Sequence, residues 1–238
     1  MVSVTTQDSS GDGFLTTPWT TIQKARDADP GIASAALGRL ATRYQGALRA
    51  FLLQIGCPRQ EVDDVLHDFF ADRFLSGHLV QNVESDRGEF RRFLRTCLRR
   101  FLISHYRSRA RRAWIQELES IDEVVWASGE SGVAQTFDRL WAEQVIANAR
   151  SRIRAEAAAG NRSDWCAAME ELIDEEPTPG TLRKIANRLG MTSGAVSTAS
   201  HRFRERLRWL IRDEVRLTVR EPGDWKEEFD HLLAALRS

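Results

Sequence analysis

The chain has 238 residues, of which 42% are hydrophobic and 29% are charged, with only 15 Gly and 6 Pro. This composition is that of a folded globular protein and argues against general disorder; the length suffices for one large domain or two small ones. No run approaches the roughly 18 consecutive apolar residues that a membrane span requires, and the first residues lack the basic and then apolar pattern of a secretory leader. We therefore expect a cytoplasmic protein.

Cysteine and histidine spacing gives no sign of a disulfide framework or a metal site. Cys57, Cys97 and Cys166 lie far apart and show neither CxxC nor Cys/His ligand spacing, so we interpret them as small, reduced core residues. His67 lies among carboxylates and is interpreted as a helix-surface residue. A glycine-rich phosphate loop, HExxH and GxSxG are all absent from the sequence. We expect no enzymatic activity, no cofactor and no metal.

The equal numbers of Lys+Arg and Asp+Glu, 34 of each, hide a strong segregation of charge along the chain. Residues 87–112 hold 10 basic and 1 acidic side chain, and residues 181–212 hold 8 and 1. Between them, residues 113–180 hold 5 basic and 14 acidic side chains. Two basic segments separated by an acidic one suggest two contacts with a polyanion.

Apolar residues recur at helical spacing through most of the chain, whereas alternating β-branched runs do not occur, so we predict an all-α fold. After a flexible start (residues 1–17), a helix is predicted up to the stop signal that begins at Gly56. An acidic amphipathic helix follows over 61–74 and a basic helix over 90–109. Residues 113–136 have weak periodicity and turn-forming residues, and we interpret them as an interdomain linker.

Residues 181–207 predict two helices joined by a tight turn. Gly190 stands where the turn needs a residue that tolerates a positive φ, the small Ala186 allows a close helix crossing, and Ser193 is placed to cap the second helix. The apolar residues that face each other are Leu182, Ile185, Ala186 and Leu189 on the first helix and Val196, Ala199, Phe203 and Leu207 on the second. This pattern predicts a DNA-binding helix-turn-helix.

The outer face of the second helix is expected to enter a major groove. Its candidate base contacts are Ser193, Gly194, Ser197, Thr198, His201 and Arg202. Arg204, Arg206 and Arg208 are expected to meet phosphates. The alternative is an ordinary pair of packed helices with a solvated basic surface.

The basic helix interleaves aromatic and arginine side chains, and its density of positive charge favours a phosphate backbone as partner. Its arginines, with those just beyond it, are Arg91, Arg92, Arg95, Arg99, Arg100, Arg107, Arg109, Arg111 and Arg112. His105 and Tyr106 are placed to stack on an unpaired base, with core filling or simple exposure as the alternative. For Phe93 and Phe101, core packing is the favoured interpretation.

The order of these segments resembles that of the extracytoplasmic-function sigma factors, and most closely that of the sigma-like group abundant in planctomycetes. In both, an acidic helix is followed by an FRxFL-type basic helix, a linker and a C-terminal helix-turn-helix. Asp63–Phe70 is similar to that family's core-polymerase-binding helix, and Arg87–Leu94 to the start of its promoter-melting helix. Leu189–Arg204 is similar to its minus-35 reader. The resemblance covers about residues 18–220.

The resemblance implies two small helical domains, sigma region 2 over 18–112 and sigma region 4 over 137–220, followed by an amphipathic extension over 221–238. The implied contacts with core RNA polymerase are Asp64, Leu66, Phe69 and Phe70; for Phe69, core packing is an equal alternative. The implied minus-10 DNA contacts are Arg91, Arg95, Arg99, Arg100, His105, Tyr106 and Arg107. The implied minus-35 contacts are Ser193, Gly194, Ser197, Thr198, His201, Arg202 and Arg204.

The expected function is therefore that of a sigma factor, monomeric when free, which directs core RNA polymerase to promoter DNA and is open to control by an anti-sigma factor. Arg100 and Ser104 stand where the family commonly has Asn and Asp, and Ser197 and Ala199 stand where it has basic residues. Two alternatives remain open: a helix-turn-helix regulator that is not a polymerase subunit, and a degenerate sigma-like protein that docks on polymerase without melting promoters. The extension over 221–238 is either a regulator of the DNA-binding faces or a packed accessory helix.

Overall fold

The computed structural model describes residues 43–72, 90–106, 113–121, 131–174, 177–219 and 223–237. All regular secondary structure in these ranges is helical, which confirms the predicted all-α class. Within the same ranges, no helix combines the length and the apolar character needed to cross a bilayer.

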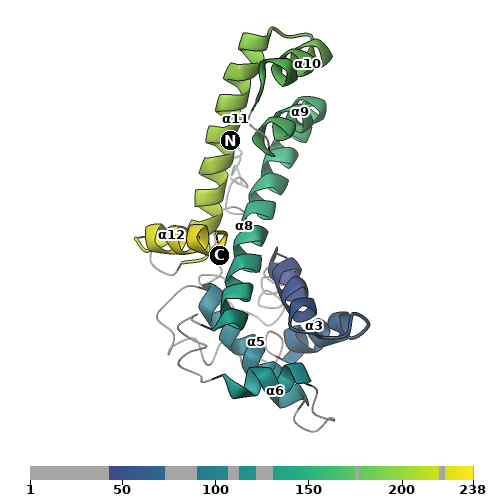
Figure 1. Cartoon of the computed structure of the whole chain (residues 1–238), viewed down its shortest axis with the longest axis vertical. Coiled ribbons are helices and arrows are strands. Elements are labelled where there is room, and N and C mark those ends of the chain that lie inside the picture. Colours follow the sequence, from purple (N-terminus) through teal and green to yellow (C-terminus); the bar gives the residue numbers. More distant parts are fainter. Residues whose placement is uncertain are drawn as a thin grey trace, which may run out of the picture.

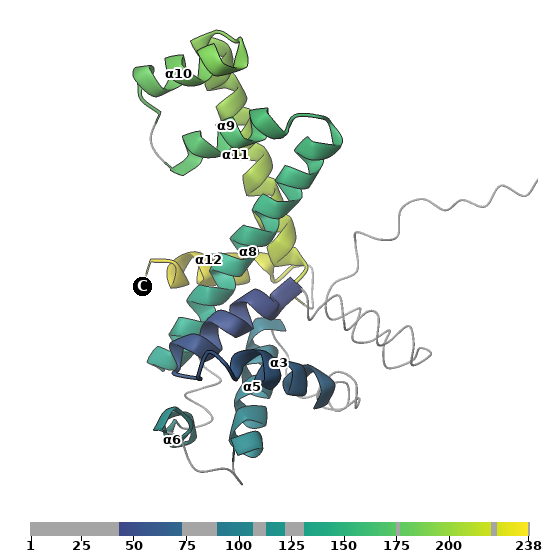
Figure 2. The same ribbon diagram turned by 90° about the vertical axis from the view of Figure 1, so that its right-hand side faces the viewer.

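The helices are arranged around two long ones. A helix over residues 43–54 is followed by α3 (Val62–Phe70), α5 (Phe90–Tyr106), α6 (Ala113–Ser120), α8 (Gly132–Ala159), α9 (Ser163–Asp174), α10 (Pro179–Leu189), α11 (Ser193–Arg216) and α12 (Trp225–Ala235). Figure 1 shows α8 and α11 side by side along the long axis, with α9 and α10 at one end and α3, α5 and α6 at the other. In Figure 2, α12 lies across the pair near its middle.

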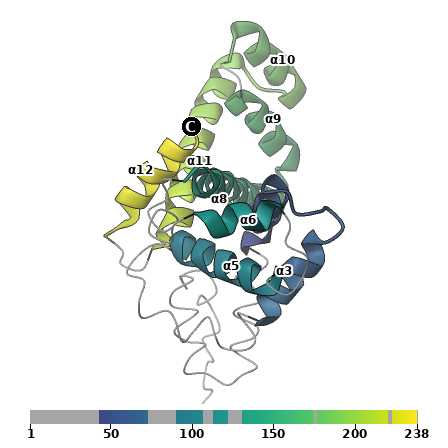
Figure 3. The ribbon, with the colours of Figure 1, turned by 60° about the horizontal axis from the view of Figure 1, so that its bottom comes forward.

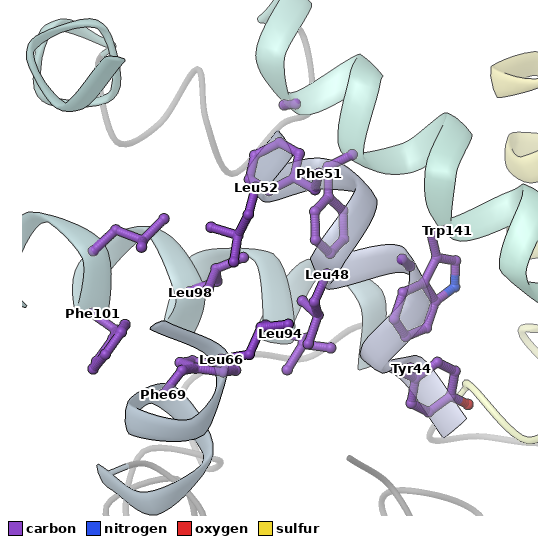
Figure 4. Packing of buried hydrophobic residues seen from close by; sticks show 14 of the residues in the cluster. Tyr44, Leu48, Phe51, Leu52, Leu66, Phe69, Leu94, Leu98, Phe101 and Trp141 are labelled. Carbon is purple, nitrogen blue, oxygen red and sulfur yellow. The ribbon is translucent and has the colours of Figure 1, made fainter. Parts of the chain in front are cut away.

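The first of two hydrophobic cores is rich in aromatic rings and is formed by the helix over 43–54 with α3, α5, α6 and the first half of α8, joined by Val215 of α11 and Leu232 of α12. Tyr44 stacks on Trp141 with ring centroids 4.3 Å apart, and Phe51 meets Phe137 edge to face at 5.1 Å. Figure 4 shows the side chains of this core converging between the helices. Aromatic pairs in these geometries stabilise packing beyond the area that they bury.

The second core is built from smaller residues at the other end of α8. Ala149, Ile153 and Ala157 of α8 pack against α9, α10 and α11 through residues that include Met169 and Phe203. The two cores therefore share one continuous helix of 28 residues, α8, whose two halves face different partners.

The prediction of a linker over 113–136 is wrong at both ends, because α6 and the start of α8 occupy them. Ile115 and Leu118 of α6 are buried in the first core, and Figure 3 shows α6 lying beside α5. At the other end, Ser131 caps α8 by accepting a hydrogen bond from the backbone N–H of Ala134 (3.1 Å). A helix of two turns has too few apolar positions to produce a clear period in the sequence. Residues 122–130 lie outside the described ranges.

The cysteines behave as small apolar residues. Cys57 and Cys166 are buried and Cys97 is half-buried, and all three are free thiols. The interpretation of Cys57 and Cys166 as reduced core residues is confirmed, and burial raises the pKa of the Cys166 thiol, which keeps it protonated.

Candidate nucleic-acid interface

The predicted helix-turn-helix is present as α10, a short turn and the first half of α11. Gly190 ends α10 in the left-handed region (φ 64°), as predicted, and the backbone N–H of Met191 bonds the carbonyl of Ala186 at 2.9 Å. Ile185, Ala186, Val196 and Phe203 are buried between the two helices. The predicted cap at Ser193 is wrong: Thr192, which has an extended backbone, accepts the hydrogen bond from the N–H of Ala195 (3.2 Å). Adjacent Thr and Ser offer the same capping oxygen, so the sequence did not separate them.

Substitutions at two glycines test the conformation assigned to the turn between α10 and α11. We expect Gly190→Ala to lower the free energy of unfolding by about 1 kcal/mol, because a Cβ in the left-handed region is strained, although it would meet no atom within 4 Å. Gly194→Ala is the matched control, since Gly194 lies in the first turn of α11 with equally open space; there we expect a gain of about 0.5 kcal/mol. Urea unfolding followed by circular dichroism measures both, and effects of the same sign would contradict the assigned turn.

The outer face of α11 presents its candidate base contacts to solvent. Ser193, Gly194, Ser197, Thr198, His201 and Arg202 are all exposed, whereas Ser200, between them in sequence, is buried. The arginines that follow differ from expectation, because Arg204 donates to the carbonyl of Leu172 and Arg206 binds both oxygens of Glu156 at 3.0 and 2.6 Å. Arg208 pairs with Glu205. Their predicted phosphate contacts would have to compete with these internal partners.

Three arginines of α5 form a buried ladder rather than a solvent-facing stripe. Arg91, Arg95 and Arg99, spaced by four, are 2%, 0% and 8% exposed. Arg91 donates to both carboxylate oxygens of Glu228 on α12 at 3.0 Å each and forms an ion pair with Asp138 on α8 at 2.6 Å. The helical spacing turns all three side chains toward the same side of α5, which packs against the rest of the protein.

Arg95 and Arg99 continue this arginine ladder along α5. Arg95 bonds the same oxygen of Asp138 at 2.8 Å. Arg99 donates to the carbonyls of Leu118 and Ile121 (3.1 and 2.6 Å), where it satisfies acceptors at the C-terminal end of α6. The ladder therefore ties α6, α8 and α12 to α5.

Asp138 is the shared anion of this ladder. Burial by itself would raise the pKa of Asp138, but a hydrogen bond with His231 (3.0 Å) and the charges of Arg91 and Arg95 outweigh it, and the pKa lies below its ordinary value. Burial also lowers the pKa of Arg95, whereas the charge and hydrogen bonds of Glu228 and Asp138 overcome burial at Arg91 and raise its pKa. The carboxylate is therefore ionised at neutral pH and balances buried positive charge.

The predicted minus-10 contacts at Arg91, Arg95 and Arg99 are thus wrong for this structure, and for Tyr106 the core-filling alternative is the one found. The arginines already have internal anions and carbonyls, and the Tyr106 side chain is fully buried, its hydroxyl 3.2 Å from the Glu61 carboxylate. Three other predicted residues have different outcomes: Arg100 is exposed, His105 is half-buried 3.9 Å from Asp68, and Arg107 lies outside the described residues.

The predicted polymerase contacts on the acidic helix α3 fall into a buried pair and a pair that solvent reaches. Leu66 and Phe69 are 1% and 0% exposed and belong to the first core, so their prediction as docking residues is wrong and the core alternative for Phe69 is confirmed. Asp64 is exposed and Phe70 is half-buried, so both remain able to contact a partner.

Comparisons with protein-family models, with curated proteins and with solved structures gave no match. Across the described ranges, no group of three His, Cys, Asp or Glu side chains is placed to hold a metal ion.

Sequence reasoning missed the two carboxylates that bind Arg91 and Arg95 of the α5 ladder. Asp138 and Glu228 both lie on the packed side of an amphipathic helix, next to Phe137 and Phe229 respectively. A carboxylate beside a large apolar residue on the buried side of a helix is costly unless it is paired, and this is the signal that predicts a buried ion pair.

Proposed function

We propose that this chain is a sigma factor of the extracytoplasmic-function type, which binds core RNA polymerase and directs it to promoter DNA. The observation that carries the proposal is the solvent-facing side of α11, on which polar and basic side chains lie near the capped start of the helix. A helix-turn-helix places this part of its second helix against base edges in a major groove. The order of motifs along the chain then favours a sigma factor over other helix-turn-helix proteins.

In this proposal the part of the chain with α10 and α11 acts as sigma region 4 and reads the minus-35 element. Hydrogen bonds from Ser197, Thr198, His201 and Arg202 to base edges supply sequence preference. The part with α3 and α5 acts as sigma region 2, and Asp64 and Phe70 of α3 contact polymerase. The chain supplies binding energy and orientation, while the polymerase active site performs the chemistry.

Run-off transcription tests the proposal directly. Purified core polymerase is mixed with this protein and with genomic promoter fragments recovered by co-purification, and we expect initiation at defined start sites only when the protein is present. The control is a variant with Thr198→Glu, which places an anion on the reading face and should abolish promoter selection. Core polymerase that neither binds the protein nor initiates with it at any genomic site would rule the proposal out.

The buried arginine ladder of α5 favours a second candidate, a sigma-like protein that docks on polymerase without melting promoters. Melting requires side chains that hold unpaired bases, and Arg91, Arg95, Arg99 and Tyr106 are committed to internal contacts. Such a protein would bind core enzyme and duplex DNA but would support initiation only on a template opened beforehand. The same transcription assay with a preformed bubble separates the two.

A further inference from the structure

A basic hollow lies beside α11, the helix that we propose reads DNA, at the place where the start of α9 meets α8 and α11. Its volume is about 260 Å³ and its lining includes Arg162, Trp165, Arg202, Arg206 and Glu156. Three guanidinium groups therefore line it against one carboxylate, and Arg202 is shared with the proposed DNA-reading face of α11.

Arg162 is held in place by both its backbone and its side chain. The turn after α8 passes through Asn161, which has a left-handed backbone (φ 55°), and the N–H of Arg162 bonds the carbonyl of Ala157 at 2.8 Å. The guanidinium carbon of Arg162 then lies 5.1 Å from the centroid of the Trp165 ring. Trp165 itself is anchored edge to face against the buried Phe203 of α11 at 5.7 Å. A long side chain fixed in this way loses little entropy when it binds an anion.

The positive charge of this hollow is only partly balanced from within. Arg206 is neutralised by its two hydrogen bonds to Glu156. Over the ranges that the structure describes, Arg162 and Arg202 have no carboxylate partner, and both are exposed. Arg162 is held beside the helix that we propose enters a major groove, and a cation in this place suits a phosphate of the duplex backbone.

We propose that Arg162, positioned by Trp165 and with Arg202 beside it, binds a backbone phosphate of the duplex that α11 reads. This inference rests on the proposed DNA-binding function and extends its footprint to the start of α9. A phosphate contact adds affinity for every sequence and no preference among them. Arg162 is then a binding residue, and Trp165 is its positioning residue.

The test measures the affinity of the full-length chain for two fluorescent duplexes, one enriched by this protein from random sequence and one scrambled, over a range of salt concentrations. We expect Arg162→Gln to weaken binding to both duplexes by the same factor, roughly 3- to 10-fold, and to reduce the slope of log affinity against log salt by about 1. The matched control is Arg154→Gln, which removes the same charge from an exposed residue of α8 that is paired with Glu170; it should change the affinity by less than about 2-fold and leave the salt slope unchanged.

A second variant separates positioning from charge. Trp165→Phe keeps an aromatic ring against Phe203 but weakens the stack under Arg162, so we expect a smaller loss of affinity with an unchanged salt slope. Thermal unfolding of each variant checks that the fold is intact.

Three outcomes decide the inference. Equal effects of Arg162→Gln and Arg154→Gln, while the wild type still prefers its enriched duplex, would overturn the phosphate contact and leave the proposed function standing. A loss at Arg162 confined to the enriched duplex would also overturn it, because that pattern belongs to a base contact. A wild-type chain that binds neither duplex would remove the proposed function and this inference together.

Discussion

Replacing Asp138 with Asn is expected to lower the free energy of unfolding by about 3–5 kcal/mol, the range found when one partner of a buried ion pair is removed. The Asp138 side chain is only 3% exposed, and it is the anion shared by Arg91, Arg95 and His231. The amide is nearly isosteric but carries no charge, so the buried guanidinium groups of Arg91 and Arg95 would lose the anion that they share. Arg91 would retain Glu228.

Urea unfolding at neutral pH, followed by far-ultraviolet circular dichroism, measures this loss. The matched control is Glu170→Gln, which removes the carboxylate from an ion pair with Arg154, whose side chain is 58% exposed. Exposed pairs contribute at most about 1 kcal/mol, so the control should stay within that limit. A loss at Asp138 no larger than the loss at Glu170 would show that the α5 ladder does not hold the first core together.

The pH dependence of the same two proteins gives an independent check. Because the pKa of Asp138 is lower in the folded state than its ordinary value of 3.8, its contribution to stability is present above that value and is lost as the pH falls through the folded pKa. The difference in stability between wild type and Asp138→Asn should therefore be largest at neutral pH and should shrink below about pH 4. A difference independent of pH would mean that Asn disturbs packing rather than charge.

Placing a carboxylate on the reading face of α11 is expected to have the largest effect on binding. Thr198 is exposed in the first turns of α11, where its hydroxyl donates to the carbonyl of Gly194 at 3.1 Å. Thr198→Glu brings a negative charge toward the bases and the flanking phosphates, and we expect affinity for the preferred duplex to fall by about 100-fold at low salt. Stability should hardly change, because no buried contact is lost.

The control for this substitution is Lys226→Glu, an exposed reversal of charge on α12, away from α10 and the start of α11. It changes the net charge by more than Thr198→Glu does, so a loss of affinity that follows net charge alone would be at least as large in the control. We expect the control to retain affinity within about 3-fold, because charges beyond a Debye length are screened. Anisotropy titrations with one labelled duplex compare the two variants directly.

The sequence predicted the helix-turn-helix closely, because every feature of that motif is local. Gly190 at a positive φ, the short side chain of Ala186 and the spacing from Val196 to Leu207 all act over a few residues. The one error, a cap assigned to Ser193 instead of Thr192, is a displacement of one residue between two equivalent hydroxyl groups.

For the basic helix α5, the sequence did not predict which groups its arginines bind. Its arginines indicated a polyanion partner, and for Arg91 and Arg95 the anions are carboxylates of this same chain, 137 and 43 residues away. Spacing along one helix identifies which side chains share a face but not what that face meets. Leu66 and Phe69 of α3 followed the same rule, since docking and core packing use the same apolar spacing.

By itself, then, the sequence determined the helical class, the turn between α10 and α11 and the segregation of charge, because helical periodicity, turn chemistry and residue counts need no knowledge of distant contacts. Only the tertiary structure decided that α8 belongs to both cores, that α6 is packed, and that Asp138 and Glu228 bind Arg91 and Arg95 of the arginine ladder. The physical reason is that burial and ion pairing depend on which helix faces meet in space, and chain folding brings those faces together from far apart in the sequence.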